Sequence, residues 1–130
     1  MERDKQIKVL LVEDEIDFRT LMTFWLKSKG YLVITAADGQ SAVQLTKKDN
    51  PDVVFLDLFI PGIDGIEVLK KIREFNKDLP VIVISAYVDT PRAKEIWSYG
   101  ISGVFCKSKD FTESLSLLES ALKTHKKLKK

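Results

Sequence analysis

Five short apolar runs, separated by longer amphipathic stretches, are the feature that most constrains the fold of this chain. The runs lie at residues 7–12, 31–36, 53–56, 81–84 and 101–106. Strand-length runs with little polar alternation are typical of strands that are buried on both faces, as in a parallel sheet covered by helices. The sequence therefore predicts an α/β fold.

The stretches between the runs have the spacing of amphipathic helices. They cover residues 16–29, 40–48, 65–75, 91–99 and 111–125. In the first of them, Phe18, Leu21, Met22 and Trp25 are expected to share one inward face. Because right-handed crossovers leave few topologies, we expect a (βα)5 chain that forms a doubly wound, five-stranded parallel sheet with helices on both faces.

The length and composition fit one cytoplasmic domain. A chain of 130 residues that is 45% hydrophobic can bury one core and leaves little room for a second domain. We expect a single domain over 1–130, with a core at about 6–124 and a tail at 123–130. Cys106, the only cysteine, lies in an apolar run and is interpreted as a buried hydrophobe. No run approaches the roughly 18 apolar residues of a membrane span, and no signal peptide is recognisable.

The net charge of +2 hides an uneven distribution. Residues 123–130 carry five lysines, and the rest of the chain has 16 basic residues against 19 acidic ones. Such a tail could contact nucleic acid or a membrane surface, but it lacks the arginines and aromatic residues typical of nucleic-acid binding. We interpret it as a solvated helix end or the start of a linker, and expect neither direct nucleic-acid binding nor membrane association.

Reactive side chains stand where the apolar runs end. Glu13 and Asp14 follow the first run, Asp57 the third, Ser85 the fourth and Lys107 the fifth. Parallel strands end at one edge of their sheet, and open α/β sheets bind ligands outside that edge. The five side chains are therefore expected to form one site.

The residue types of this site indicate phosphoryl chemistry. Carboxylates about 4 Å apart repel by about 4 kcal/mol per pair at an effective dielectric near 20, so a cation has to compensate them. Hard oxygen ligands favour Mg²⁺ or Mn²⁺. Lys107 can meet an anionic phosphoryl group, Ser85 can donate a hydrogen bond to it, and Asp57 can act as the nucleophile that forms an aspartyl phosphate. The neighbouring Glu15 and Asp17 are interpreted only as first-turn helix residues.

At these positions the chain resembles the receiver domains of two-component response regulators, similar to the chemotaxis type. The resemblance covers roughly residues 6–124 and depends on four motifs: LLVEDE at 10–15, DLFIPGIDG at 57–65, the Ser85-Ala86 pair and Lys107. It implies the strand order 2-1-3-4-5. It also implies a signalling phosphoacceptor that catalyses its own phosphorylation and dephosphorylation, rather than an enzyme with other substrates.

The resemblance further implies roles for individual residues and partners. Asp57 would accept phosphate from a sensor histidine kinase or a phosphotransfer protein. Asp14, Asp57 and the backbone carbonyl of Phe59 would ligate Mg²⁺, and Glu13 would act mainly through a metal-bound water. An effector domain or a downstream protein would receive the signal. Phe59 and Tyr87, each two positions beyond a site residue, would also border the phosphate, where aromatic side chains are expected to restrict the attacking water.

Two positions depart from the family's pattern. Ser108 stands where the family usually has a proline after the lysine. Val104 stands where the switch aromatic usually lies, and the aromatic Phe105 follows on the opposite strand face. These departures leave open a pseudo-receiver, which would bind partners without phosphorylation.

The sequence disfavours two other functions on the same architecture. A phosphohydrolase of the haloacid-dehalogenase type needs a second aspartate two residues after the nucleophile, where this chain has Phe59. A dinucleotide module needs a glycine-rich first turn, whereas residues 13–17 read EDEID.

A sparse apolar line at Leu117, Ala121 and Leu128 could support a homodimer, although such residues are more often scattered on a surface.

Overall fold

The computed structural model describes residues 6–85, 90–107 and 111–129, which form ten alternating strands and helices. The strands are β1 (Lys8–Val12), β2 (Leu32–Ala36), β3 (Val53–Asp57), β4 (Val81–Ser85) and β5 (Gly103–Cys106). The helices are α1 (Ile16–Ser28), α2 (Gly39–Asp49), α3 (Gly65–Phe75), α4 (Thr90–Trp97) and α5 (Phe111–Lys129). The predicted (βα)5 order is confirmed.

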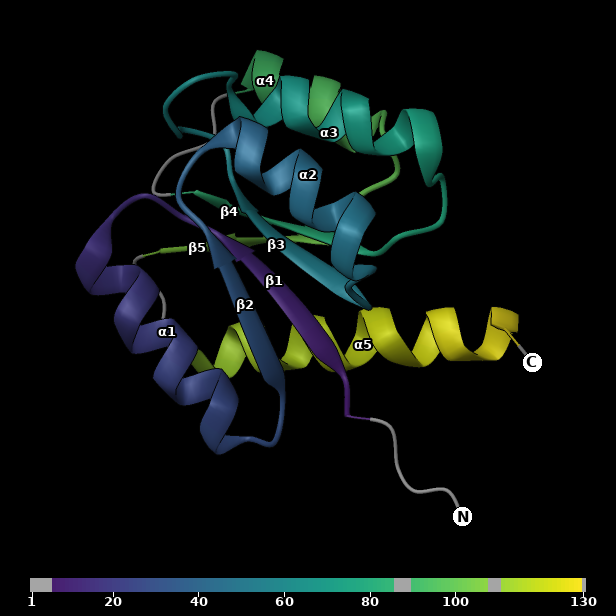
Figure 1. The fold of residues 1–130 in the computed structure, drawn as a ribbon. Coiled ribbons are helices and arrows are strands. Elements are labelled where there is room, and N and C mark those ends of the chain that lie inside the picture. The colour runs from purple at the N-terminus through teal and green to yellow at the C-terminus, as the bar shows by residue number, and fades with distance from the viewer. Residues whose placement is uncertain (1–5, 86–89, 108–110, 130) are drawn as a thin grey trace.

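The strands form one parallel sheet in the order β2-β1-β3-β4-β5, as Figure 1 shows. The chain runs outward from β1 to β2, returns past β1 to β3, and continues to β4 and β5. The winding therefore reverses between β1 and β3, and this reversal is where a doubly wound sheet leaves a crevice at its carboxyl edge.

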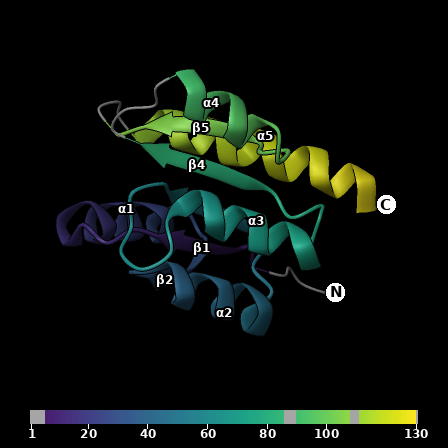
Figure 2. The ribbon, with the colours of Figure 1, turned by 90° about the horizontal axis from the view of Figure 1, so that it is seen from above.

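Helices cover both faces of the sheet, with α2, α3 and α4 on one side and α1 and α5 on the other (Figures 1 and 2). Successive residues of β1 alternate between two cores: Leu10 and Val12 pack beneath α2, α3 and α4, and Val9 and Leu11 pack with α1 and α5. Both cores exclude solvent from these side chains completely. Burial on both faces explains why the strands read as uninterrupted apolar runs.

Some sequence-based expectations need correction. Leu21 was expected to face inward, but it is 59% exposed, and the buried face of α1 centres on Met22 and Leu26. The helix is amphipathic, but only a narrow stripe reaches the sheet. The fifth strand was expected over 101–106, but its pairing with β4 begins only at Gly103. Cys106, at the end of this strand, is half-buried rather than buried.

Two of the three residues of the apolar line expected on α5 pack inward. Ala121 is buried and Leu117 packs against the core shared by α1 and α5. A Cβ added to Gly103 would approach Leu117 Cδ2 to 2.8 Å, so the helix is pressed closely against β5. These contacts engage Leu117 and Ala121 within the domain, and the homodimer stays a prediction. Leu128 lies outside the residues whose side chains are described.

The two residues near the end of β5 face opposite cores, as predicted. Phe105 is fully buried in the core shared by α1 and α5, with its ring 6.5 Å from that of Phe111. Val104 is half-buried and packs against the other core. The aromatic side chain is therefore on the wrong face to replace a residue at position 104. Ser108 lies outside the described residues.

Candidate functional site

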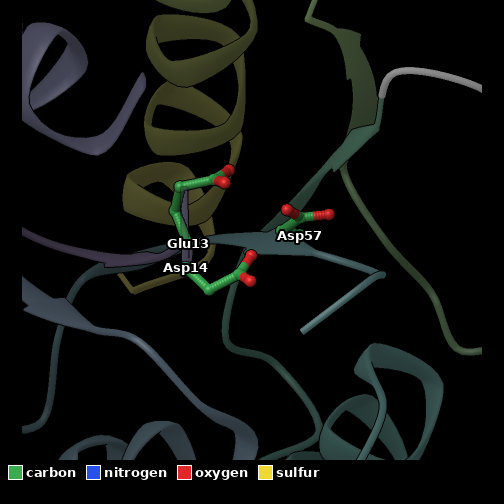
Figure 3. A group of neighbouring side chains, drawn as sticks. All are labelled: Glu13, Asp14 and Asp57. Atoms are coloured by element: carbon green, nitrogen blue, oxygen red, sulfur yellow. The ribbon is translucent and has the colours of Figure 1, made fainter. Parts of the chain in front are cut away.

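Three carboxylates meet where β1 and β3 end. These strands are hydrogen-bonded neighbours with Val12 opposite Leu56, so Glu13 and Asp14 emerge beside Asp57. One carboxylate oxygen from each residue lies within 4.8 Å of the others. Figure 3 shows the side chains of Glu13 and Asp14 extending toward that of Asp57. The convergence expected from the sequence is present.

Glu13 is the most deeply buried of the three, with no exposed surface. Its backbone amide donates to the carbonyl of Ala36 at 2.9 Å, which places the residue at the end of the sheet. Its Oε2 accepts hydrogen bonds from the Lys107 ammonium at 2.9 Å and from the backbone amide of Glu15 at 3.0 Å. Its Oε1 is buried and has no hydrogen-bond partner among the described residues.

The environment of Glu13 changes its titration. Burial and, to a smaller extent, the charge of Asp57 raise the pKa of its carboxyl, and the hydrogen bonds from Lys107 and the Glu15 amide lower it. The net result is an increase of this pKa from 4.5 to about 7. A buried carboxylate oxygen without a partner is unfavourable. A bound cation would satisfy that oxygen and favour the ionised form.

Lys107 joins the carboxylates from the far side of the sheet. Its Nζ lies 2.9 Å from Glu13 Oε2, 3.1 Å from Asp57 Oδ2 and 3.2 Å from Glu15 Oε1. It also lies 5.1 Å from the centre of the Phe18 ring. Burial lowers the pKa of Lys107, but its hydrogen bonds to Glu13 and Asp57 outweigh burial and raise the pKa above its usual value. The ammonium is therefore a permanent positive charge in the site.

Asp57 is held at the centre of the group. It is 3% exposed, its Oδ1 accepts a hydrogen bond from the Phe59 amide at 3.0 Å, and its Oδ2 contacts Lys107. Ser85 is 1% exposed and follows Ile84, which pairs with Asp57 across β3 and β4. The carbonyl of Ser85 accepts a hydrogen bond from the Lys107 amide at 3.0 Å. Both predicted residues thus lie at this edge.

The loop after Asp57 requires glycine at position 65. A Cβ there would stand 2.5 Å from Leu58 Cα and 2.8 Å from the Asp57 carbonyl oxygen. The Gly65 amide also donates to the Leu58 carbonyl at 3.0 Å. The close approach lets α3 begin directly beneath the strand end, so the DLFIPGIDG motif positions Asp57 as well as containing it.

Sequence reasoning missed three contributors from the start of α1. Glu15 contacts Lys107 with its carboxylate, and Phe18 lies beside the same ammonium. Arg19 Nη1 donates to the Glu13 carbonyl at 2.9 Å, which fixes the backbone of the acidic turn. The run of three acids at 13–15 was a visible signal for Glu15, whereas the contacts of Phe18 and Arg19 depend on how α1 packs.

The donor set fits a magnesium ion. All three groups are carboxylates, which are hard oxygen ligands, and the unpaired Glu13 Oε1 lies in the same cluster. One lysine offsets four carboxylates, counting Glu15, so the site is short of positive charge. The acidic triad is thus consistent with a Mg²⁺ site. Whether the Phe59 carbonyl is a ligand stays a prediction.

The chain belongs to the response regulator receiver domain family, because the family's sequence model matches residues 9–119. This family comprises signalling phosphoacceptors of two-component phosphorelay systems rather than classical enzymes. Among curated proteins, this chain is 35% identical over 106 residues to sporulation initiation phosphotransferase F of Bacillus subtilis. The match covers 82% of this chain and 86% of the relative.

Solved structures show the same architecture. The response regulator TrrA of Thermotoga maritima, solved in complex with Mg²⁺ and BeF, is 32% identical with a TM-score of 0.82, and the match covers 90% of this chain and all of that one. A CheY-like receiver from Methanospirillum hungatei has a TM-score of 0.91 over 95% of this chain and 98% of its own. At 18% identity, it supports the fold alone.

Longer regulators match over only part of their length. The transcriptional regulatory protein PhoP of Bacillus subtilis is 39% identical over 79 residues, which is 61% of this chain but 33% of that protein. The outputs of such regulators therefore say nothing direct about this chain. Among the described residues, no helix combines the length and apolar composition that crossing a bilayer requires.

Proposed function

We propose that this receiver domain accepts a phosphoryl group on Asp57 and that Mg²⁺ held by Asp14 and Asp57, with Glu13 nearby, is required for the transfer. The observation that carries the proposal is the meeting of three carboxylates with Lys107 at one strand edge. Membership of the receiver family and the Mg²⁺–BeF complex of TrrA support the same interpretation.

The proposed step is a displacement at phosphorus. A carboxylate oxygen of Asp57 forms the new bond to phosphorus while the phosphorus–nitrogen bond of a phosphohistidine breaks. The imidazole leaves with the electron pair of that bond and takes up a proton from solvent to become neutral. With acetyl phosphate as donor, the leaving group is acetate. Bound Mg²⁺ would supply positive charge against the oxygens of the transferred group.

The chain's own residues have distinct parts in this step. Lys107 remains protonated and lies 3.1 Å from Asp57, so it can follow the charge that moves onto the phosphoryl oxygens. Ser85, buried at the end of the neighbouring strand, is proposed to donate a hydrogen bond to one of those oxygens. The amide of Phe59 holds Asp57 Oδ1 and thereby orients the nucleophile.

The proposal extends to the domain and its partners. Residues 1–130 would act as a single receiver unit, with its core at 6–124. A sensor histidine kinase or a phosphotransfer protein would be the donor, and a separate protein or an effector domain would receive the signal. The cytoplasmic location expected from the sequence is part of the proposal.

Mass spectrometry after incubation with acetyl phosphate and Mg²⁺ tests the function. We expect one added phosphoryl group on the wild type, loss of the label in Asp57→Asn and in EDTA, and an unchanged label in Asp17→Asn. The last variant removes an exposed carboxylate from α1 outside the triad. A wild type that takes no label would favour the pseudo-receiver, and a label that persists in Asp57→Asn would place the nucleophile elsewhere.

A further inference from the structure

Three carboxylates of very different exposure share the ammonium group of Lys107. The side chains of Glu13 and Asp57 are 0% and 4% exposed, whereas that of Glu15 is 61% exposed. The corresponding distances from Nζ, between 2.9 and 3.2 Å, all allow a hydrogen bond. Because an ammonium has three N–H donors, these partners use its full capacity.

Glu15 is also unusual for its position in α1. It occupies the N-cap, where a side chain ordinarily accepts a hydrogen bond from the first turn. Here the side chain makes no capping hydrogen bond. Its amide is bound by Glu13 Oε2 and its carbonyl accepts from the Arg19 amide at 3.0 Å, so its backbone is fixed. The carboxylate instead reaches Lys107, whose Nζ lies beside Phe18 from the same helix.

A phosphoryl group on Asp57 needs donors from Lys107. The donor that now contacts Asp57 Oδ2 can supply one, and a second becomes available only if Glu13 or Glu15 releases its contact. Glu13 cannot leave easily, because its buried carboxylate would lose a charged partner. Glu15 can, because water is available to solvate its exposed carboxylate and an exposed ion pair contributes little. Its negative charge also opposes the approach of an anionic phosphodonor.

We propose that Glu15 is a displaceable third partner of Lys107, a positioning residue that slows phosphorylation of Asp57 by occupying the ammonium donor needed by the incoming phosphoryl group. This inference rests on the proposed phosphoacceptor function. It assigns to Glu15 a regulatory contact, whereas from the sequence this residue is interpreted only as part of the first helical turn.

The matched test compares Glu15→Gln with Asp17→Asn. Both substitutions remove one negative charge from an exposed side chain near the start of α1, but only Glu15 contacts Lys107. With acetyl phosphate and Mg²⁺, we expect Glu15→Gln to raise the phosphorylation rate constant about two- to fivefold, the range of one exposed ion pair. Asp17→Asn should leave that rate unchanged.

Two further measurements separate this role from a merely structural one. Hydrolysis of the phosphorylated form should change less than its formation in Glu15→Gln, because the phosphoryl group has by then already displaced Glu15. In the unphosphorylated protein, NMR should show faster solvent exchange of the Lys107 ammonium protons in Glu15→Gln than in the wild type or Asp17→Asn.

The outcomes are distinct. If the wild type is labelled but Glu15→Gln is phosphorylated at the same rate, the inference fails and the proposed function stands. Equal acceleration in Asp17→Asn would mean that the phosphorylation rate depends on the net charge near α1 rather than on the contact with Lys107, and it would also overturn the inference. A wild type that accepts no label would remove the proposed function and this inference together.

Discussion

Nζ of Lys107 lies 2.9 Å from Oε2 of Glu13, although the two residues are 94 positions apart and their strands are not neighbours. Strands β3 and β4 lie between β1 and β5, so the lysine side chain reaches across the edge of the sheet. This contact places an ammonium group against the most buried acid of the triad. It also explains why the site depends on the whole fold rather than on one loop.

The raised pKa of Glu13 predicts that the metal-free protein becomes less stable as pH increases. Between pH 4.5 and about 7, folded Glu13 holds a proton that the unfolded chain has released, so the free energy of unfolding falls. The loss from this group is complete above its folded pKa and amounts to at most about 3 kcal/mol.

Urea denaturation in EDTA at pH 5 and pH 8 measures this effect. Glu13→Gln removes the titrating group, and we expect it to show a smaller difference between the two pH values than the wild type. Equal pH dependence in the two proteins would mean that Glu13 does not titrate in this window.

The contacts of Arg73 predict a role in stability away from the triad. Its guanidinium donates to the carbonyls of Tyr99 at 2.7 Å, Asn76 at 3.1 Å and Gly100 at 3.2 Å, joining the end of α3 to the segment after α4. Burial lowers the pKa of Arg73, yet the side chain stays charged. Arg73→Met leaves three carbonyls without this donor.

We expect Arg73→Met to reduce the free energy of unfolding by about 2 kcal/mol, since hydrogen bonds from a charged group are worth more than neutral ones. Lys70→Met, on the exposed surface of α3, is the control and should change stability by less than about 0.5 kcal/mol. Chemical denaturation decides between them, and similar losses in both variants would contradict the prediction.

Much of this architecture was predictable because it follows from local patterning. The apolar runs predicted the strands, and the acids that follow two of these runs, Glu13, Asp14 and Asp57, predicted the centre of the site. The exposure of Leu21 was not predictable, because periodicity cannot tell how wide a stripe of α1 the sheet covers. The contact of Glu15 with Lys107 was missed for a similar reason. The preferences of residues at a helix start describe one helix alone, whereas Lys107 follows β5 and reaches Glu15 only in the folded sheet.

The close approach at Gly65 predicts a coupled loss of stability and metal binding. The added methyl of Gly65→Ala would clash with the backbone of Leu58 and of Asp57, and neither can move without displacing the strand end. We expect a loss of at least about 2 kcal/mol in stability and weaker Mg²⁺ binding in calorimetry. Gly30→Ala is the control, because Gly30 has a φ of +97° but open space around it. Gly30→Ala should lose stability through backbone strain without weakening Mg²⁺ binding. Weaker Mg²⁺ binding in this control would mean that the effect of Gly65→Ala does not act through Asp57.

The exposed aromatic ring after Asp57 predicts a long-lived phosphoryl state. Phe59 is 55% exposed and its amide is hydrogen-bonded to the carboxylate of Asp57, so its side chain starts beside the proposed phosphorylation site. An apolar ring at this place should hinder an attacking water. We expect Phe59→Asn to accelerate dephosphorylation, as followed by loss of the labelled mass over time. Unchanged hydrolysis would mean that the ring only covers the surface. Tyr87, expected to act similarly, lies outside the described residues.

The unpaired oxygen of Glu13 and the surplus of carboxylates predict that Mg²⁺ stabilises the folded protein. A ligand that binds only the folded state at ten times its Kd adds about 1.4 kcal/mol to the free energy of unfolding, and the cation also relieves repulsion within the triad. Asp14→Asn should lose most of this gain, because Asp14 provides one of the three converging carboxylates. Asp17→Asn should retain it. Thermal unfolding at fixed pH, with Mg²⁺ titrated against EDTA, measures the shift. A full shift in Asp14→Asn, or none in the wild type, would show that the three acids do not form the metal site.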